Sequence, residues 1–453
     1  MSNEAHTIAK RIIEALDRRD HEELVRLLQK VPEGELPQRL AQLTEADQRR
    51  LLEAIPAEVA SSLLQELPES QVTRLLEELA PSQAAAILDH LPSDEQADLL
   101  GALPDEEASK LLEIMNPEEA SDARRLLQFA PDTAGGLMIT EYLAYTETCT
   151  VEDIVEDLRI NAARYRSYDV QYFYTVDAEG RLTGVLRVRD LLLSEPDTQI
   201  ATIAVRQPVS VATDTSLDKL EHLFAHYQFY GLPVVDRDGR LVGLVRRYDV
   251  EEAIAARANR NFLKVVGISG GEELRSMPLR DRIKGRTSWL TVNLILDLIA
   301  ASVIPFFEET ISAVIALVFF LPIISDMGGN TGIQSIGVTL RELAAGLITP
   351  RDAWRTFWRE LPVAVINGLV VGFLLAGVAL VWRGNPYLGI LIGSALTLNT
   401  VIAACLGAVL PLGLRRIGID PAVASGPILT TIADLTGFFM VLGGAAVILP
   451  YLT

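Results

Sequence analysis

Residues Gly426–Pro450 read GPILTTIADLTGFFMVLGGAAVILP, a run whose only charged side chain is Asp434. A helix of about 20 consecutive apolar residues is long enough to cross the hydrocarbon core of a bilayer. A carboxylate at mid-membrane costs ~2.5–3.5 kcal/mol even on a lenient insertion scale, so such residues are usually functional. The stretch therefore predicts a membrane-crossing helix. Its Asp434 must be protonated, paired with a base, or directed toward water and a cation.

We extend this run to residues 421–450. Four more apolar runs precede it. They cover residues 287–304, 311–340, 361–382 and 387–412. Basic residues mark the cytoplasmic side of a membrane protein, and here they alternate with the runs. They lie before the first run, between the second and third, and after the fourth: Arg275, Arg280, Arg282, Lys284, Arg286; Arg341, Arg351, Arg355, Arg359; Arg415, Arg416. The pattern predicts five crossings in the plasma (inner) membrane, with the N-terminus cytoplasmic and the C-terminus outside.

The second run contains features that predict an interrupted helix. Pro322 is followed by DMGGNTGIQ at residues 326–334. Glycine and proline free backbone amides and carbonyls, which a membrane tolerates only where protein or water satisfies them. Broken helices of this kind surround the binding sites of transporters. We therefore expect this segment to break and to line a water-filled path.

The polar side chains of the predicted crossings are mainly oxygen donors. Asp434 and Asn330 are joined by three hydroxyls: Thr430, Thr431 and Thr400. No Lys, Arg or His lies in the core of a predicted crossing, and Cys405 stands alone there. Such ligands favour a hard divalent cation, and Mg²⁺ in particular binds one or two carboxylates while keeping several waters. A proton relay or a structural hydrogen bond remains the alternative. Two chains around one axis would supply two Asp434 carboxylates, so charge balance favours a homodimer.

The first part of the chain carries a twelve-residue repeat. Apolar residues recur at helical spacing within each unit, and each unit ends at a proline, which begins helices readily but cannot continue one. The recurring pairs are Leu51–Leu52, Leu63–Leu64, Leu75–Leu76, Ile87–Leu88, Leu99–Leu100 and Leu111–Leu112, and the prolines are Pro56, Pro68, Pro81, Pro92, Pro104 and Pro117. The repeat predicts a stack of short helices over residues 1–133.

The net charge of −20 is confined to the first 260 residues. Residues 1–140 hold 28 acidic and 13 basic side chains, residues 141–260 hold 20 and 14, and residues 261–453 hold 12 and 13. An acidic surface of this size repels nucleic acid and attracts cations. The polar start of the chain has no apolar secretory segment. We therefore expect cytoplasmic soluble domains that do not bind nucleic acid.

A tandem repeat follows the helical region. Residues 176–191 read VDAEGRLTGVLRVRDL and residues 235–250 read VDRDGRLVGLVRRYDV, with eight of sixteen positions identical. The pair resembles tandem CBS domains, an α/β module over residues 134–258 that often binds adenine nucleotides such as ATP. The family's signature places Ser or Thr three residues before an Asp that holds the ribose. The acids are present as Asp190 and Asp249, but Arg187 and Arg246 replace the hydroxyls. This departure argues against nucleotide binding and favours a structural, sensing module.

The order of these parts resembles the MgtE-type magnesium channels over essentially the whole chain. The resemblance rests on the helical repeat, the CBS pair, GGNTGIQ at residues 328–334 and DPAVASGPILTTIADLTG at residues 420–437. It implies a homodimeric Mg²⁺ channel, gated from the cytoplasm, with Asp434 and Asn330 in the pore. Thr431 is the further candidate pore ligand. It also implies a connecting helix over residues 259–284 and a transmembrane domain over residues 285–453.

In this family, cytoplasmic Mg²⁺ bridges acidic faces of the soluble domains and closes the pore. The candidate bridging acids are Asp94, Glu95, Asp98, Asp214, Asp249, Glu251 and Glu252. The connecting helix departs from the family, because Arg257, Arg260 and Lys264 follow Glu252 and the next acid is Glu272. Gating by Mg²⁺ is therefore expected to be weaker, absent, or dependent on other faces.

Two other functions fit the residues. One is a divalent cation exchanger coupled to protons or sodium, in which Asp434 would cycle a proton. The other is a membrane-tethered sensor of adenine nucleotides. No GxxxxGK[ST] loop is present, so an ATP-driven pump lacks its usual phosphate-binding motif. No nucleophile elbow or metal-hydrolase motif indicates an enzyme.

Overall fold

The computed structural model describes residues 2–31, 36–40, 43–166, 168–268, 277 and 279–453. The chain divides into two units, Met1–Ala256 and Arg257–Thr453. The predicted connecting helix at residues 259–284 falls partly outside the described residues. The helix α16 (Arg247–Val265) covers the start of this range and α17 (Leu279–Ala301) its end.

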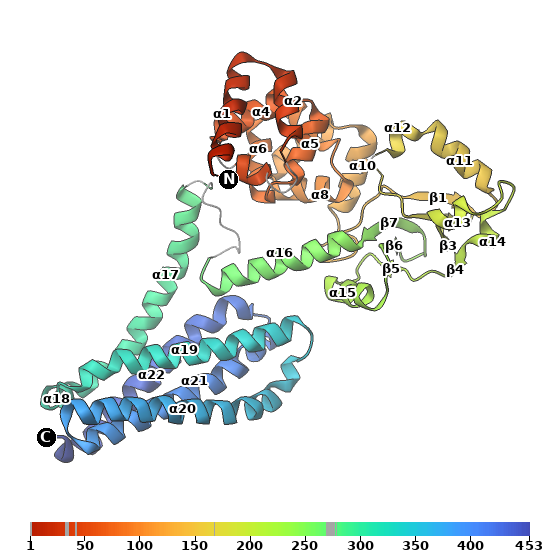
Figure 1. The fold of residues 1–453 in the computed structure, drawn as a ribbon. Coiled ribbons are helices and arrows are strands. Elements are labelled where there is room, and N and C mark those ends of the chain that lie inside the picture. Colours follow the sequence, from red (N-terminus) through yellow and green to blue (C-terminus); the bar gives the residue numbers. More distant parts are fainter. Residues whose placement is uncertain (1, 32–35, 41–42, 167, 269–276, 278) are drawn as a thin grey trace. The chain divides into compact units, whose positions relative to one another are not determined.

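The first unit begins with the predicted stack of short helices, drawn in red and orange in Figure 1. They are α1 (Ser2–Arg18), α2 (His21–Gln29), α3 (Leu36–Leu40), α4 (Glu45–Ala54), α5 (Ala57–Gln65), α6 (Glu69–Glu78), α7 (Pro81–Leu88), α8 (Ser93–Ala102), α9 (Asp105–Ile114) and α10 (Pro117–Leu126). From α4 to α9 each helix carries one of the six repeated apolar pairs, which confirms the repeat. The repeated apolar pairs form one continuous core, because each short helix buries its stripe against its neighbours.

The prolines of the repeat set the helix starts. Pro56, Pro68, Pro92 and Pro104 are the N-cap residues of α5, α6, α8 and α9. Pro81 and Pro117 are instead the first residues of α7 and α10. A proline is harmless at these positions because the first amides of a helix have no intrahelical acceptor.

The tandem repeat forms two similar α/β halves, which confirms the CBS pair. The first contains β1 (Leu143–Thr146), α11 (Val151–Ile160), α12 (Ala162–Tyr165), β2 (Tyr172–Val176), β3 (Leu182–Arg187), α13 (Val188–Leu192) and α14 (Ile200–Ile203). The second contains β5 (Val211–Ala212), α15 (Leu217–His226), β6 (Gly231–Val235), β7 (Leu241–Arg246) and α16. The short strand β4 (Val205–Arg206) lies between the two halves in sequence and pairs with β3 of the first. One sheet has the order β1-β2-β3-β4 and the other β5-β6-β7.

The two halves match in detail as well as in order. In each, a parallel strand pair is followed by an antiparallel pair with a register shift at the corresponding position, Thr175/Val176 and Val234/Val235. The turn glycines Gly180 and Gly239 both have φ of +80°, a conformation that glycine adopts without strain. The amides of Leu182 and Leu241 donate to the carbonyls of Gly239 and Gly180, so the two hairpin turns pair reciprocally.

The second unit is helical. It contains α17, η1 (Ile304–Phe307), α18 (Glu308–Ala313), α19 (Leu317–Ala344), η2 (Pro350–Asp352), α20 (Ala353–Arg383), α21 (Pro386–Arg416), α22 (Pro421–Val447) and α23 (Leu449–Leu452). The long helices α19 to α22 pack side by side, with α21 the most buried of them (Figure 1). Large apolar side chains remain exposed on α20, among them Leu369, Phe373 and Val381. Such faces suit contact with lipid.

Within the described residues, four segments are long and apolar enough to cross a membrane. They are Arg282–Ala313, Pro350–Arg383, Pro386–Arg416 and Pro421–Val447. The helix α19 is also long, at 28 residues, but it carries Asp326, Asn330 and Gln334 in its middle. The predicted count of five crossings is compatible with these helices, and α19 is the one that composition alone does not identify.

The expectation that the glycine-rich segment breaks its helix is wrong. Residues 326–334 are helical throughout, and α19 continues past Pro322 from Leu317 to Ala344. Its glycines serve close packing instead: a Cβ on Gly407 of α21 would lie 2.3 Å from the carbonyl oxygen of Gly332. Because backbones approach this closely only without side chains, tertiary contacts offset the poor helix propensity of glycine.

Candidate ion-binding site

Asp434 lies midway along α22 and is half-buried. The hydroxyl of Ser325 on α19 donates a hydrogen bond to one of its carboxylate oxygens. No lysine, arginine or histidine among the described residues is within ion-pair distance of this carboxylate. The second oxygen therefore keeps acceptor capacity that no side chain of the described residues uses. An unneutralised carboxylate among apolar helices is a suitable ligand for a cation.

A buried amide holds α19 and α22 in this arrangement. Asn399 of α21 is fully buried, and its Nδ2 donates to the carbonyl of Ile324 at 3.1 Å while its Oδ1 accepts from Thr436 Oγ1 at 2.9 Å. Gly328 leaves room for it, since a Cβ there would lie 2.3 Å from Asn399 Nδ2. Sequence reasoning missed Asn399, although a lone amide within an apolar run is the signal that marks it.

Asn330 lies on the exposed side of α19, one helical turn after Asp326. Its Nδ2 donates to Asp326 Oδ2 at 3.1 Å, which leaves the Asn330 carbonyl oxygen available as a ligand. Gln334 is exposed one turn further along the same helix. Sequence reasoning also missed Asp326 and Gln334, because both lie inside the segment that it interpreted as a break. The continuous helix places the three polar side chains in one line.

The predicted threonine ligands differ in how their hydroxyls are used. Thr431 is buried and donates to the carbonyl of Pro427 at 2.7 Å. Thr430 is half-buried and donates to the carbonyls of Gly426 and Pro427. Thr400 is buried on α21, and its hydroxyl has no hydrogen-bond partner in the described structure. The Thr430 and Thr431 oxygens keep lone pairs, but their protons are committed to the backbone of α22.

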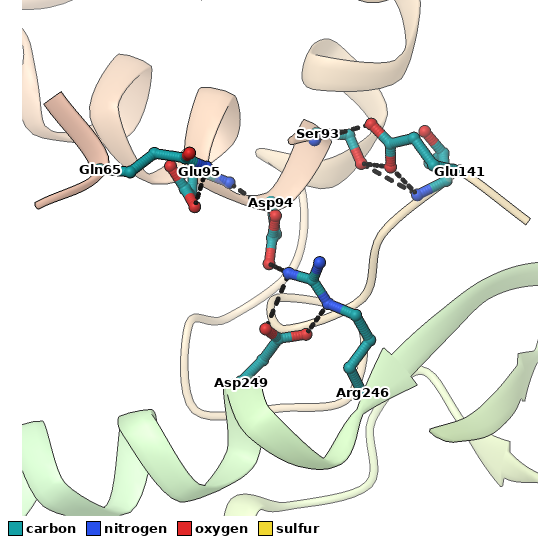
Figure 2. A network of polar contacts seen from close by, with 8 residues as sticks. Gln65, Ser93, Asp94, Glu95, Glu141, Arg246 and Asp249 are labelled. Atoms are coloured by element: carbon teal, nitrogen blue, oxygen red, sulfur yellow. Dashed lines mark hydrogen bonds and ion pairs between the residues drawn. The ribbon is translucent and has the colours of Figure 1, made fainter. Parts of the chain in front are cut away.

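The predicted regulatory acids fall into two groups. Asp94 and Glu95 lie in the first turn of α8 and Asp249 in the first turn of α16, and the Arg246 side chain lies between Asp94 and Asp249 (Figure 2), whereas Glu252 of α16 is exposed. Burial raises the pKa of Asp94 well above its ordinary value and also raises that of Glu95. The remaining predicted acids, Asp98, Asp214 and Glu251, are exposed.

A cavity of about 280 Å³ opens between the two CBS halves. Its lining includes Tyr142, Tyr172, Tyr230, Tyr248, Arg246 and Arg247. Of the two signature acids, Asp190 lies 3.4 Å from Arg189 and 4.0 Å from Arg187, whereas Asp249 binds Arg246. Both aspartates are thus already paired with arginines of the chain.

Three family models match the chain in the order of its parts. Residues 31–132 match the MgtE intracellular N domain, residues 200–256 the CBS domain and residues 321–444 the divalent cation transporter model named MgtE. The last match covers most of α19, all of α20 and α21 and most of α22, and it includes Asp326, Asn330 and Asp434.

Solved structures resemble the first unit. The soluble part of a magnesium transporter shares 27% identity at a TM-score of 0.51, covering 56% of this chain and 99% of that one. The cytosolic domain of the Mg²⁺ channel MgtE in complex with ATP shares 34% identity at a TM-score of 0.50, covering 54% and 99%.

Curated relatives cover both units of the chain. A magnesium transporter MgtE of Thermus thermophilus is 37% identical over 330 residues, which is 72% of each chain. A magnesium transporter MgtE of Bacillus subtilis is 31% identical over 318 residues, 70% of each chain. With its helical N domain, CBS pair and apolar helices in the same order, the chain belongs to the MgtE family of magnesium transporters.

Proposed function

We propose that this protein is a Mg²⁺ channel that conducts the ion down its electrochemical gradient across the plasma membrane. Asp434 is its central ligand and Asn330 lines the path. The supporting observation is the environment of Asp434, a carboxylate fixed by Ser325 among apolar helices with no basic partner in the described structure. Mg²⁺ would approach with much of its water shell, because it dehydrates reluctantly.

We further propose that α19 also crosses the membrane, as the second crossing in chain order, and faces the path. An exposed acid is costly against lipid, so the line Asp326, Asn330 and Gln334 requires water or protein on that side. In this orientation the N-terminus is cytoplasmic and the C-terminus outside, as the basic residues between the runs indicate.

A homodimer would complete the site. The described residues of one chain contain no group of three or more His, Cys, Asp or Glu side chains that could hold a metal ion. A second chain related by a two-fold axis would bring a second Asp434 to the path and supply two negative charges for one divalent ion. An isologous dimer is the commonest way to build such an axis.

Regulation by the cytosolic unit is part of the proposal. The exposed acids Asp98, Asp214, Glu251 and Glu252, with Glu95, form candidate Mg²⁺-sensing faces that repel one another until cations bind. The ATP complex of the similar cytosolic domain makes ATP a candidate ligand of the CBS pair. Binding of ATP to the purified full chain, measured by calorimetry, tests this second ligand directly.

Flux into proteoliposomes tests the channel. Wild-type protein should carry Mg²⁺ inward under a membrane potential, and Asp434→Ala should lose transport while keeping its oligomeric state and melting temperature. Asp434→Glu is the matched control, because it retains the charge. Equal flux in wild type and Asp434→Ala would refute the site.

The same assay separates a channel from a coupled exchanger. A channel carries Mg²⁺ with equal pH on both sides and without sodium. Flux that requires a proton or sodium gradient would support the exchanger instead.

A further inference from the structure

The contact between the helical domain and the CBS pair contains a buried cation supplied by the chain itself. Arg246, at the end of β7, donates from Nε to Asp249 Oδ2 and from Nη2 to Asp249 Oδ1, both at 2.7 Å. The same Nη2 lies 3.4 Å from Asp94 Oδ2 on α8. Figure 2 shows the guanidinium between the two carboxylates. Asp94 and Arg246 are 152 residues apart in sequence, so this bridge joins two domains.

The effect of this bridge on the domain contact depends on how deeply its charged side chains are buried. The side chains of Asp94 and Asp249 are 11% and 8% exposed, and that of Arg246 is 24% exposed. Burial raises the pKa of Asp94, and the neighbouring Asp249 carboxylate raises it further. Burial alone lowers the pKa of Arg246, but its hydrogen bonds to Asp249 and the charge of Asp94 raise the net value above that of ordinary arginine. Without the guanidinium, two buried carboxylates would face each other without a counterion.

The rest of the contact fits tightly around this bridge. Ser93, the first residue of α8, donates from its amide and its hydroxyl to the two oxygens of Glu141, at 2.9 and 2.7 Å. Glu141 precedes β1, so the N-terminus of α8 is fixed to the CBS pair at two adjacent points (Figure 2). A carboxylate suits this end of a helix because its free amides and dipole attract negative charge.

We infer that Arg246 acts as a built-in cation between Asp94 and Asp249, in place of a bound divalent ion. This contact between the helical domain and the CBS pair therefore stays closed in the absence of Mg²⁺. The inference narrows the proposed sensing surface, because Asp94 and Asp249 are then unavailable to bridging Mg²⁺. It rests on the contacts within the first unit and holds whether or not the protein is a channel.

The chain offers an internal control for this claim. Arg187 is the residue of the first CBS half that corresponds to Arg246, and Asp190 corresponds to Asp249. The Arg187 side chain is 55% exposed and lies 4.0 Å from Asp190. Arg187 thus occupies the position in the first half that Arg246 occupies in the second. Among the described residues, it lacks a second, buried carboxylate of the kind that Asp94 supplies to Arg246. Removing its charge should therefore have little effect on the domain contact.

Hydrogen exchange of the full-length protein tests the inference. Protection of the first turns of α8 and α16 is compared in EDTA and in millimolar Mg²⁺. Wild type and Arg187→Ala should be protected equally in both. Arg246→Ala should exchange roughly a hundredfold faster in EDTA, since removing one partner strands buried charge, and Mg²⁺ should restore its protection.

Two further variants separate charge from packing. Arg246→Lys, which keeps the charge, should retain most of the protection in EDTA. The double variant Asp94→Asn with Arg246→Ala should be insensitive to Mg²⁺, because the repulsion between carboxylates is gone. The inference is overturned if wild-type protection requires Mg²⁺, if Arg246→Ala is fully protected in EDTA, or if Mg²⁺ fails to restore Arg246→Ala.

Discussion

Two sites in the described part of the chain, one around Arg246 and one at Asp434, withdraw carboxylates from bulk water but neutralise them in different ways. In the first unit, Arg246 binds Asp249 and reaches Asp94. In the helical unit, the contact given to Asp434 is a neutral hydroxyl, that of Ser325. A carboxylate beside an arginine already has a counterion, whereas one that receives only a hydroxyl still attracts a cation. The comparison separates acids that hold the fold from acids available to the transported ion.

Giving Asp434 a base of its own should abolish transport. Ser325→Lys places an ammonium group next to the carboxylate and makes this site resemble the cytosolic one. Because a fixed positive charge repels a divalent ion from the path, we expect flux to fall about a hundredfold or more. Mg²⁺ uptake into proteoliposomes measures this.

The matched control for this variant is Ser325→Met, which adds similar bulk without charge. It should retain much more flux than Ser325→Lys. Equal loss of flux in both variants would show that crowding, not charge, blocks transport. The proposed contrast between Asp434 and the carboxylates beside Arg246 would then be wrong.

Asp326 allows a second test, with a smaller expected effect, of whether carboxylates on the proposed path attract Mg²⁺. It lies on the exposed side of α19 and accepts a hydrogen bond from Asn330. For a Mg²⁺ ion about 10 Å from the Asp326 carboxylate in a water-filled path with a dielectric constant near 80, the attraction is about 0.8 kcal/mol. Asp326→Asn should therefore reduce the apparent affinity for Mg²⁺ about fourfold, measured as the concentration for half-maximal flux. Asp326→Glu should behave nearly as wild type, and unchanged affinity in Asp326→Asn would place this acid outside the path.

The sequence predicts those parts of the structure that depend on residues close together in the chain. The twelve-residue repeat and the tandem CBS halves are local periodic patterns, so their helices and strands could be predicted. The role of the glycines in α19 could not, because it depends on how closely Gly332 approaches Gly407. Asp434 was recognisable as a lone acid in an apolar run. Its partner Ser325 and the pairing of Asp94 with Arg246 are long-range contacts that no local pattern encodes.

The smallest predicted effect is the pH dependence of the contact around Arg246. Its charged groups are Asp94, Glu95, Asp249, Glu252 and Arg246, with Asp169 acting on Asp249 from the CBS pair. Burial raises the pKa of Asp94 above its ordinary value of 3.8, so the folded state binds its proton more tightly than the unfolded state does. The stability of the contact should therefore increase as the pH falls through the raised value toward 3.8, by at most about 1.4 kcal/mol per pH unit per proton.

Asp94→Asn should weaken this dependence. Asparagine cannot titrate, and its neutral amide carries no charge to compete with Asp249 for the Arg246 guanidinium. Chemical denaturation of the full chain, followed through the first unit as the pH is lowered from neutral toward 3.8, should show a shallower slope in the variant than in wild type. Asp98→Asn, an exposed acid of the same helix, should keep the wild-type slope. A wild-type contact that instead weakens on mild acidification would mean that ionised Asp94 is favoured, so that Arg246 more than offsets the cost of burying it.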